Sequence, residues 1–103
     1  MLKLTLNEAL GRLAHEESDY LELIKQRKFD LGLYQPVMVD PQTPHARDEL
    51  YIIAAGTGTF VCAGASRPFA PGDVFFVPAH TEHRFLEFSP DFATWVVFFG
   101  TPG

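Results

Sequence analysis

The sequence predicts an all-β domain, a barrel or a sandwich, preceded by one short helix. From Tyr20 onward, short apolar or alternating runs are separated by Gly, Pro and Asp at roughly even spacing, which is typical of antiparallel β domains. Apolar residues make up 47% of the chain and include ten Phe, so there is enough material for a packed core. A length of 103 residues fits one domain, and we expect residues 1–103 to form it.

The predicted helix lies near the N-terminus. Thr5 and Glu8 have the spacing of a capping box, in which a hydroxyl and a carboxylate satisfy backbone donors at a helix start. Leu6, Leu10 and Leu13 follow at helical spacing and form an apolar stripe. We expect this stripe to cover one end or one face of the sheet.

The remaining chain divides into candidate strands and turns. The predicted strands are 20–27, 30–39, 48–55, 58–63, 73–77, 83–88 and 92–99. A hairpin turn is expected at Gly56-Thr57-Gly58, and another turn at Pro71-Gly72-Asp73. The last strand is apolar on both faces, which predicts a second layer outside it. Either the N-terminal helix or a second subunit in a homodimer would supply that layer.

Charge and composition exclude several classes of partner. The net charge is −5 and no Lys/Arg cluster is present, so we expect neither nucleic acid nor an anionic membrane to bind. No apolar stretch reaches the length of a membrane span, and the first residues do not resemble a signal peptide. The single cysteine, Cys62, cannot form an internal disulfide, which favours a cytoplasmic location.

The segment that points to chemistry begins at His45. His45 and Glu49 are four residues apart, and in an extended chain this spacing puts both side chains on one face. Arg47 and Tyr51 have the same parity. An imidazole and a carboxylate on one face form a ligand pair that needs a third partner, and a second segment offers His83.

These two segments resemble the paired motifs of the cupin superfamily. His45, Glu49 and Gly56 match the end of the first motif, while Gly72, Pro78 and His83 match the second. The resemblance covers about residues 30 to 99. It implies a double-stranded β-helix, or jelly-roll barrel, with one divalent metal ion held by His45, Glu49 and His83.

Three departures from the family pattern alter the expected site. Thr43 stands where the first motif has another His, His80 replaces a Gly of the second motif, and Glu87 replaces a frequent Asn. Two imidazoles and one carboxylate suit Fe, Mn, Ni or Zn, so the metal's identity stays open. Thr43 could hold a metal-bound water and His80 could serve as a fourth ligand; otherwise they are a strand hydroxyl and a loop histidine.

Other residues are candidates for the pocket around the ion. Tyr34 and Tyr51 would line it, or else serve as core residues. Arg47 would bind an anion or form a salt bridge at the rim. Phe85 and Glu87 share the parity of His83 and complete the candidate pocket, with a solvated strand end as the alternative for Glu87.

Three functions remain compatible with these residues. The first is a small metalloenzyme, similar to a dioxygenase or an isomerase, that acts on a small oxygenated metabolite. The second is a module that binds a sugar or an organic acid without turnover, and the third is a metal-free dimerising scaffold. A fold by itself does not decide among them.

Overall fold

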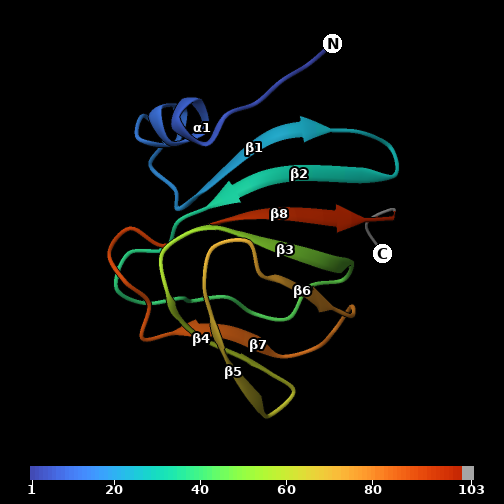
Figure 1. The fold of residues 1–103 in the computed structure, drawn as a ribbon. Coiled ribbons are helices and arrows are strands. Elements are labelled where there is room, and N and C mark those ends of the chain that lie inside the picture. The colour runs from blue at the N-terminus through green and yellow to red at the C-terminus, as the bar shows by residue number, and fades with distance from the viewer. Residues whose placement is uncertain (101–103) are drawn as a thin grey trace.

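The computed structural model describes residues 1–100 as two antiparallel β-sheets that face each other, with one helix outside (Figure 1). The five-stranded sheet has the order β1-β2-β8-β3-β6, and the three-stranded sheet has the order β5-β4-β7. The elements are α1 (Leu6–Leu13), β1 (Tyr20–Lys25), β2 (Phe29–Tyr34), β3 (Asp48–Ala55), β4 (Gly58–Cys62), β5 (Ala65–Phe69), β6 (Val74–Val77), β7 (His83–Leu86) and β8 (Ala93–Phe99). The all-β prediction with a short N-terminal helix is confirmed.

The main core lies between the two sheets. Alternate residues of each strand point inward, because successive side chains of a β-strand face opposite sides. The inward set is rich in aromatic rings and consists of Tyr34, Tyr51, Ile53, Phe60, Phe69, Val77, Phe85, Phe92 and Val96. Four of the ten Phe thus lie in this core, and Phe75, Phe88 and Phe98 pack against it while partly buried.

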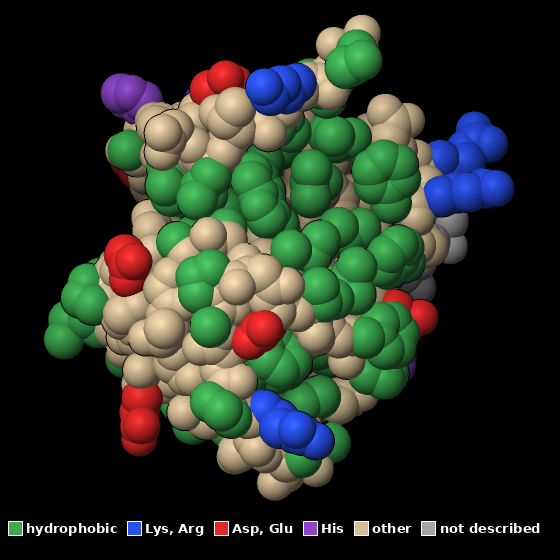
Figure 2. Space-filling view, in the orientation of Figure 1, with side chains coloured by type: hydrophobic (Ala, Val, Ile, Leu, Met, Phe, Trp, Pro, Cys, Tyr) green, Lys and Arg blue, Asp and Glu red, His purple; other side chains and the backbone are tan. Residues whose placement is uncertain are grey.

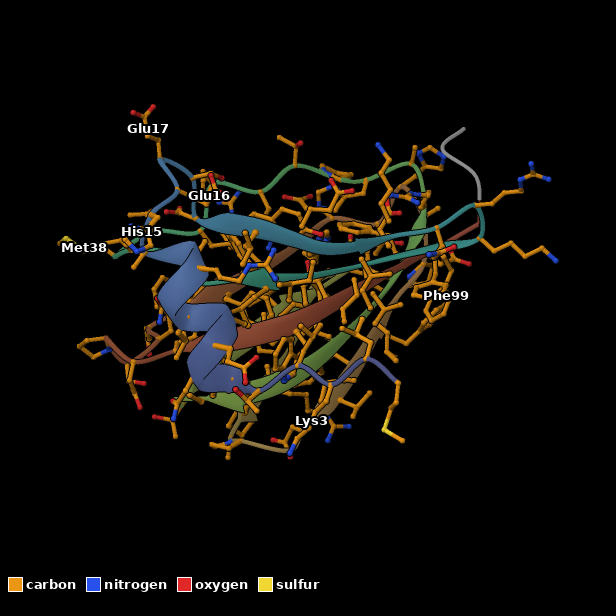
Figure 3. The ribbon with its side chains drawn as sticks, turned by 90° about the horizontal axis from the view of Figure 1, so that it is seen from above. Lys3, His15, Glu16, Glu17, Met38 and Phe99 are labelled. Carbon is orange, nitrogen blue, oxygen red and sulfur yellow. The ribbon has the colours of Figure 1, made fainter. Side chains whose placement is uncertain are left out.

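A second apolar cluster joins α1 to the outer face of the five-stranded sheet. Ala9 and Leu13 of the helix pack against Leu21, Leu33 and Ala93 of the sheet. Seen from above, α1 lies at the end of the strands opposite Phe99, and the segment leading to it, which carries Lys3, runs toward the other end (Figure 3). The helix thus covers the start of the doubly apolar last strand, at Ala93 and Trp95. No helix within residues 1–100 is long and apolar enough to cross a membrane.

Part of the same outer face is left uncovered. Phe29 pairs with Phe99 at the end distant from α1, and their exposed fractions are 38% and 42%. On the edge strand β6, which is separated from β8 by β3, Val74 and Phe76 are 56% and 57% exposed. Figure 2 shows apolar side chains gathered over this face. The homodimer expected from the sequence stays a prediction.

The hairpin expected at Gly56–Gly58 was wrong, because β3 and β4 belong to different sheets. The chain crosses there from one sheet to the other. Gly56 has a φ of +88°, and a Cβ on it would lie 2.5 Å from the Cα of Phe92. Only glycine fits a crossing this tight. The turn expected at Pro71–Asp73 is present, with Gly72 at a φ of +93°.

The sequence prediction missed β5 and overextended β2. Four of the five β5 residues are exposed, and the strand contains Pro68, so it lacks the alternation that identifies strands. An edge position tolerates this proline because one side of the strand needs no hydrogen-bond partner. The true hairpin joins β4 to β5 through Ala63-Gly64, both with positive φ. The run predicted as 30–39 ends at Tyr34, two residues before Pro36.

The helix start gives a first testable prediction. The hydroxyl of Thr5 accepts a hydrogen bond of 3.1 Å from the backbone N–H of Glu8, as expected for an N-cap. Replacing Thr5 with alanine should lower the free energy of unfolding by ~1 kcal/mol, measured by urea denaturation. The control Thr57→Ala, at an exposed position in the crossing between β3 and β4, should change it by less than ~0.5 kcal/mol. Equal effects of the two substitutions would contradict the capping role.

Candidate metal centre

Two histidines and a glutamate from separate parts of the chain meet between the two sheets. Glu49 points inward from β3, His83 is the first residue of β7 in the opposite sheet, and His45 lies in the segment before β3. One oxygen of the Glu49 carboxylate, Oε1, lies 3.5 Å from Nε2 of His45 and 3.4 Å from Nε2 of His83. One ligand atom from each of the three residues falls within 4.8 Å of the others.

This arrangement fits a divalent metal ion. Two donors bound at ~2.1 Å to one ion lie about 3.0–3.4 Å apart, close to the separations observed here. The second oxygen of Glu49, Oε2, is buried and has no hydrogen-bond partner within residues 1–100. A buried polar atom without a partner is costly unless something absent from the protein chain satisfies it. A cation beside the carboxylate would do so.

Burial shifts the pKa values of two of the three residues. Burial raises the pKa of Glu49 from its ordinary value of 4.5 to about 7. Burial, followed by the proximity of His83, lowers the pKa of His45, so its imidazole is neutral at pH 7. The neutral imidazole of His45 can bind metal directly, whereas Glu49 binds metal in its ionised form, which a cation would favour.

Hydrogen bonds fix the histidine on β7 in a favourable tautomer. Nδ1 of His83 lies 2.9 Å from the carbonyl oxygen of Thr81, which can only accept, so Nδ1 holds the proton. In the neutral imidazole the lone pair is then on Nε2, which faces the cluster and lies 3.0 Å from the hydroxyl of Tyr51. Burial raises the pKa of Tyr51, which keeps its hydroxyl protonated. A partner that orients a ligating histidine in this way is common at metal sites.

Two further residues belong to the site and were missed in the sequence. The side-chain oxygen of Gln42 lies 3.1 Å from Nε2 of His45 and 2.9 Å from the hydroxyl of Tyr51. The buried carboxylate of Asp40 accepts a 2.9 Å hydrogen bond from the amide nitrogen of Gln42. Both lie in the irregular segment between β2 and β3, where parity along a strand cannot be used to predict orientation.

The structure does not bring Thr43 and His80 into the cluster. The side chains of both residues are exposed. His80 has a φ of +63°, which explains why the family pattern has glycine at this position. Its backbone N–H donates a 2.6 Å hydrogen bond to the carbonyl of His45 and so joins the two motif segments. The expected roles as water holder and fourth ligand are not supported.

The candidate pocket residues divide between core and surface. Phe85 is fully buried among other aromatic rings, and the hydroxyl of buried Tyr34 donates to Asp40 at 2.6 Å. For Arg47 the alternatives were anion binding and a salt bridge at the rim. The structure shows the salt bridge, with Nη2 2.6 Å from Oδ2 of Asp30. Glu87 is exposed and has a φ of +51°, so it does not belong to the pocket.

A cavity of about 210 Å³ adjoins the cluster on the His45 side. Its walls are formed by neutral side chains, namely Tyr20, Tyr34, Gln42, His45, Val96 and Phe98. The ring of Tyr20 lies across Gly32, where any Cβ would overlap the ring. This volume is below the ~300–1,000 Å³ of pockets for drug-sized ligands, so it suits a small molecule.

Comparisons with known proteins agree with this architecture. A family model described as a cupin domain matches residues 32–99. An uncharacterised protein of Streptomyces coelicolor is 33% identical over 95 residues, which cover 90% of each chain. A solved structure from Thermus thermophilus superposes with a TM-score of 0.75 at 20% identity, covering 98% of this chain and 100% of that one.

A further structural neighbour carries a functional description. A protein of Ralstonia eutropha, described as a candidate mannose-6-phosphate isomerase, superposes with a TM-score of 0.65 at 23% identity, covering 80% of this chain and 83% of that one. Similarity at this level establishes the fold alone. The family match, which spans well over half of the chain, establishes more: this chain belongs to the cupin superfamily.

Proposed function

We propose that this cupin domain binds one divalent transition-metal ion through His45, Glu49 and His83 and uses it on a small oxygenated metabolite. The observation that carries the proposal is the buried carboxylate of Glu49: its Oε1 lies within 3.5 Å of the imidazole nitrogens of His45 and His83, and its Oε2 has no hydrogen-bond partner within residues 1–100. When bound, such an ion polarises a substrate oxygen or binds dioxygen, the chemistry of an isomerase or a dioxygenase.

Apart from the proposed ion, no group in the cavity wall would attract a charged ligand. Its walls contain no Lys, Arg, Asp or Glu, and the nearby guanidinium of Arg47 is engaged by Asp30. A sugar phosphate of the kind named for the Ralstonia eutropha neighbour would therefore meet no cationic side chain there. The hydroxyls of Tyr20 and Tyr34 and the amide of Gln42 would orient a small neutral molecule, and the aromatic walls would exclude water.

Metal binding is the experiment that tests the proposal. Purified protein freed of metal should bind one equivalent of Mn²⁺, Fe²⁺, Co²⁺, Ni²⁺ or Zn²⁺ in calorimetric titrations. Glu49→Gln and His83→Ala should each weaken binding at least about tenfold, because each removes one of only three strong donors.

The matched control is His80→Asn, which removes a nearby but exposed imidazole and suits a backbone with positive φ. It should leave the affinity unchanged. A wild-type protein that binds none of these ions, or ligand variants that bind as tightly as wild type, would refute the proposal.

Binding without turnover is the second candidate. It is favoured by the positions of Glu87, which is exposed, and Arg47, which is held in a salt bridge, because both were candidates for acting on a substrate. Oxygen uptake by the Fe²⁺-loaded protein with a panel of small neutral carbonyl compounds and polyols separates the candidates. Saturable ligand binding with neither oxygen uptake nor isomerised product would support the binding module.

A further inference from the structure

The side chain of Gln42 places a fourth potential donor at the metal cluster. Its oxygen, Oε1, lies 3.1 Å from Nε2 of His45 and 2.9 Å from the hydroxyl of Tyr51, which is itself 3.0 Å from Nε2 of His83. The amide oxygen is thus a direct neighbour of one proposed ligand and shares Tyr51 as a neighbour with the other.

The orientation of the Gln42 amide follows from its other contact. The nitrogen, Nε2, lies 2.9 Å from Oδ2 of Asp40. Since an ionised carboxylate can only accept hydrogen bonds, the NH₂ group must face Asp40 and the carbonyl oxygen must face the cluster. The reverse flip would set two acceptors against each other at Asp40.

Asp40 is itself held rigidly. It is 1% exposed, and its carboxylate accepts hydrogen bonds from the hydroxyl of Tyr34 at 2.6 Å and the backbone N–H of Phe85 at 2.8 Å. The backbone N–H of Gln42 donates to the same carboxylate at 3.1 Å. These contacts connect Asp40 to β2, to β7 and to the segment that carries Gln42. Asp40 therefore holds the Gln42 amide in a fixed orientation.

We propose that Gln42 supplies a fourth, neutral oxygen ligand to the metal ion, and that Asp40 is the positioning residue that directs this oxygen inward. The proposal rests on the metal-binding function proposed above. It also accounts for the departure at Thr43. The family pattern has a histidine ligand at this position, and here the adjacent Gln42 would supply the fourth donor instead. A set of two imidazoles, one carboxylate and one amide carbonyl favours ions that accept oxygen ligands readily, such as Mn²⁺ and Fe²⁺.

The test removes the donor while keeping a side chain of similar size. Gln42→Leu should weaken Mn²⁺ binding in calorimetric titrations about tenfold or more. The visible absorption spectrum of the Co²⁺-loaded protein should also change, because the ligand set loses an oxygen. The control Thr43→Val alters the adjacent exposed residue and should change neither the affinity nor the spectrum.

The outcomes separate this inference from the proposed function. If the wild type binds no metal, the proposed function fails. If the wild type binds, His83→Ala weakens binding and Gln42→Leu changes neither affinity nor spectrum, then only the fourth ligand is refuted. Should Gln42→Leu not fold, as judged by circular dichroism, Gln42→Met is measured against the same criteria.

A double-mutant cycle tests the role of Asp40. Asp40→Asn replaces an acceptor with an amide and so favours the opposite flip of Gln42; it should weaken Mn²⁺ binding in the wild-type background. In the Gln42→Leu background it should have no further effect on affinity, although it still lowers stability. An equal loss of affinity in both backgrounds would show a merely structural role and refute the positioning.

Discussion

Replacing Phe85 with alanine should lower the free energy of unfolding by ~3–5 kcal/mol, the range for large-to-small changes of buried aromatic residues. Phe85 is fully buried at the centre of the barrel. Its ring centroid lies 4.7 Å from that of Phe60, 4.8 Å from that of Phe92 and 4.9 Å from that of Tyr51. Because these rings come from both sheets, they cannot close around the space that alanine would leave.

The control is the next residue on the same strand. Leu86 points to the opposite face of β7 and is 42% exposed, so Leu86→Ala should cost about 0.5 kcal/mol or less. Both variants are compared with wild type by urea denaturation of the metal-free protein. A loss below about 1 kcal/mol for Phe85→Ala would mean that the aromatic cluster does not hold the two sheets together.

The contribution of Glu49 to the stability of the metal-free protein should fall as the pH rises from 4.5 to 7. Glu49 has a pKa of about 7 in the folded protein, against an ordinary value of 4.5, because burial penalises its charged form. Between these pH values the folded state binds the proton that the unfolded state releases, so the slope of the unfolding free energy is negative. At ~1.4 kcal/mol per pKa unit, the contribution of Glu49 falls by roughly 3 kcal/mol across this window.

The difference between wild type and Glu49→Gln isolates this contribution. His45, whose pKa is lowered, has the opposite effect between its folded pKa and 6.5, and the difference cancels it. Urea denaturation at intervals from pH 4 to 8 should give curves that diverge between pH 4.5 and 7 and run parallel above that. Parallel curves throughout would contradict the raised pKa of Glu49.

The sequence predicted the elements of this fold better than their connections. Strand positions followed from alternating apolar residues, and the helix from Thr5 and its leucine stripe, because these are local signals. Which sheet a strand joins is not a local property: Gly56 was equally compatible with a hairpin and with a crossing between sheets. β5 was not predicted because four of its five residues are exposed. An edge strand that buries so few side chains needs no alternation of apolar and polar residues in its sequence.

The candidate site was predicted where strand geometry applies and missed where it does not. Glu49 and Tyr51 share an inward face of β3, as their even spacing indicated. Gln42 and Asp40 lie in a segment interrupted by Pro41 and Pro44, so no periodicity indicates which side chains turn inward. His80 was difficult for a related reason, since its positive φ turns the backbone away from the course of an extended chain.

The absence of a side chain at Gly32 also affects the size of the ligand that the cavity beside the metal cluster can bind. Because the ring of Tyr20 packs directly on the backbone of Gly32, the position of this cavity wall depends on a residue that is not itself a proposed ligand of the ion. Substitution at residue 32 would displace the wall and leave the four donors in place. Redesign of substrate size could therefore begin at Gly32, separately from the chemistry of the centre.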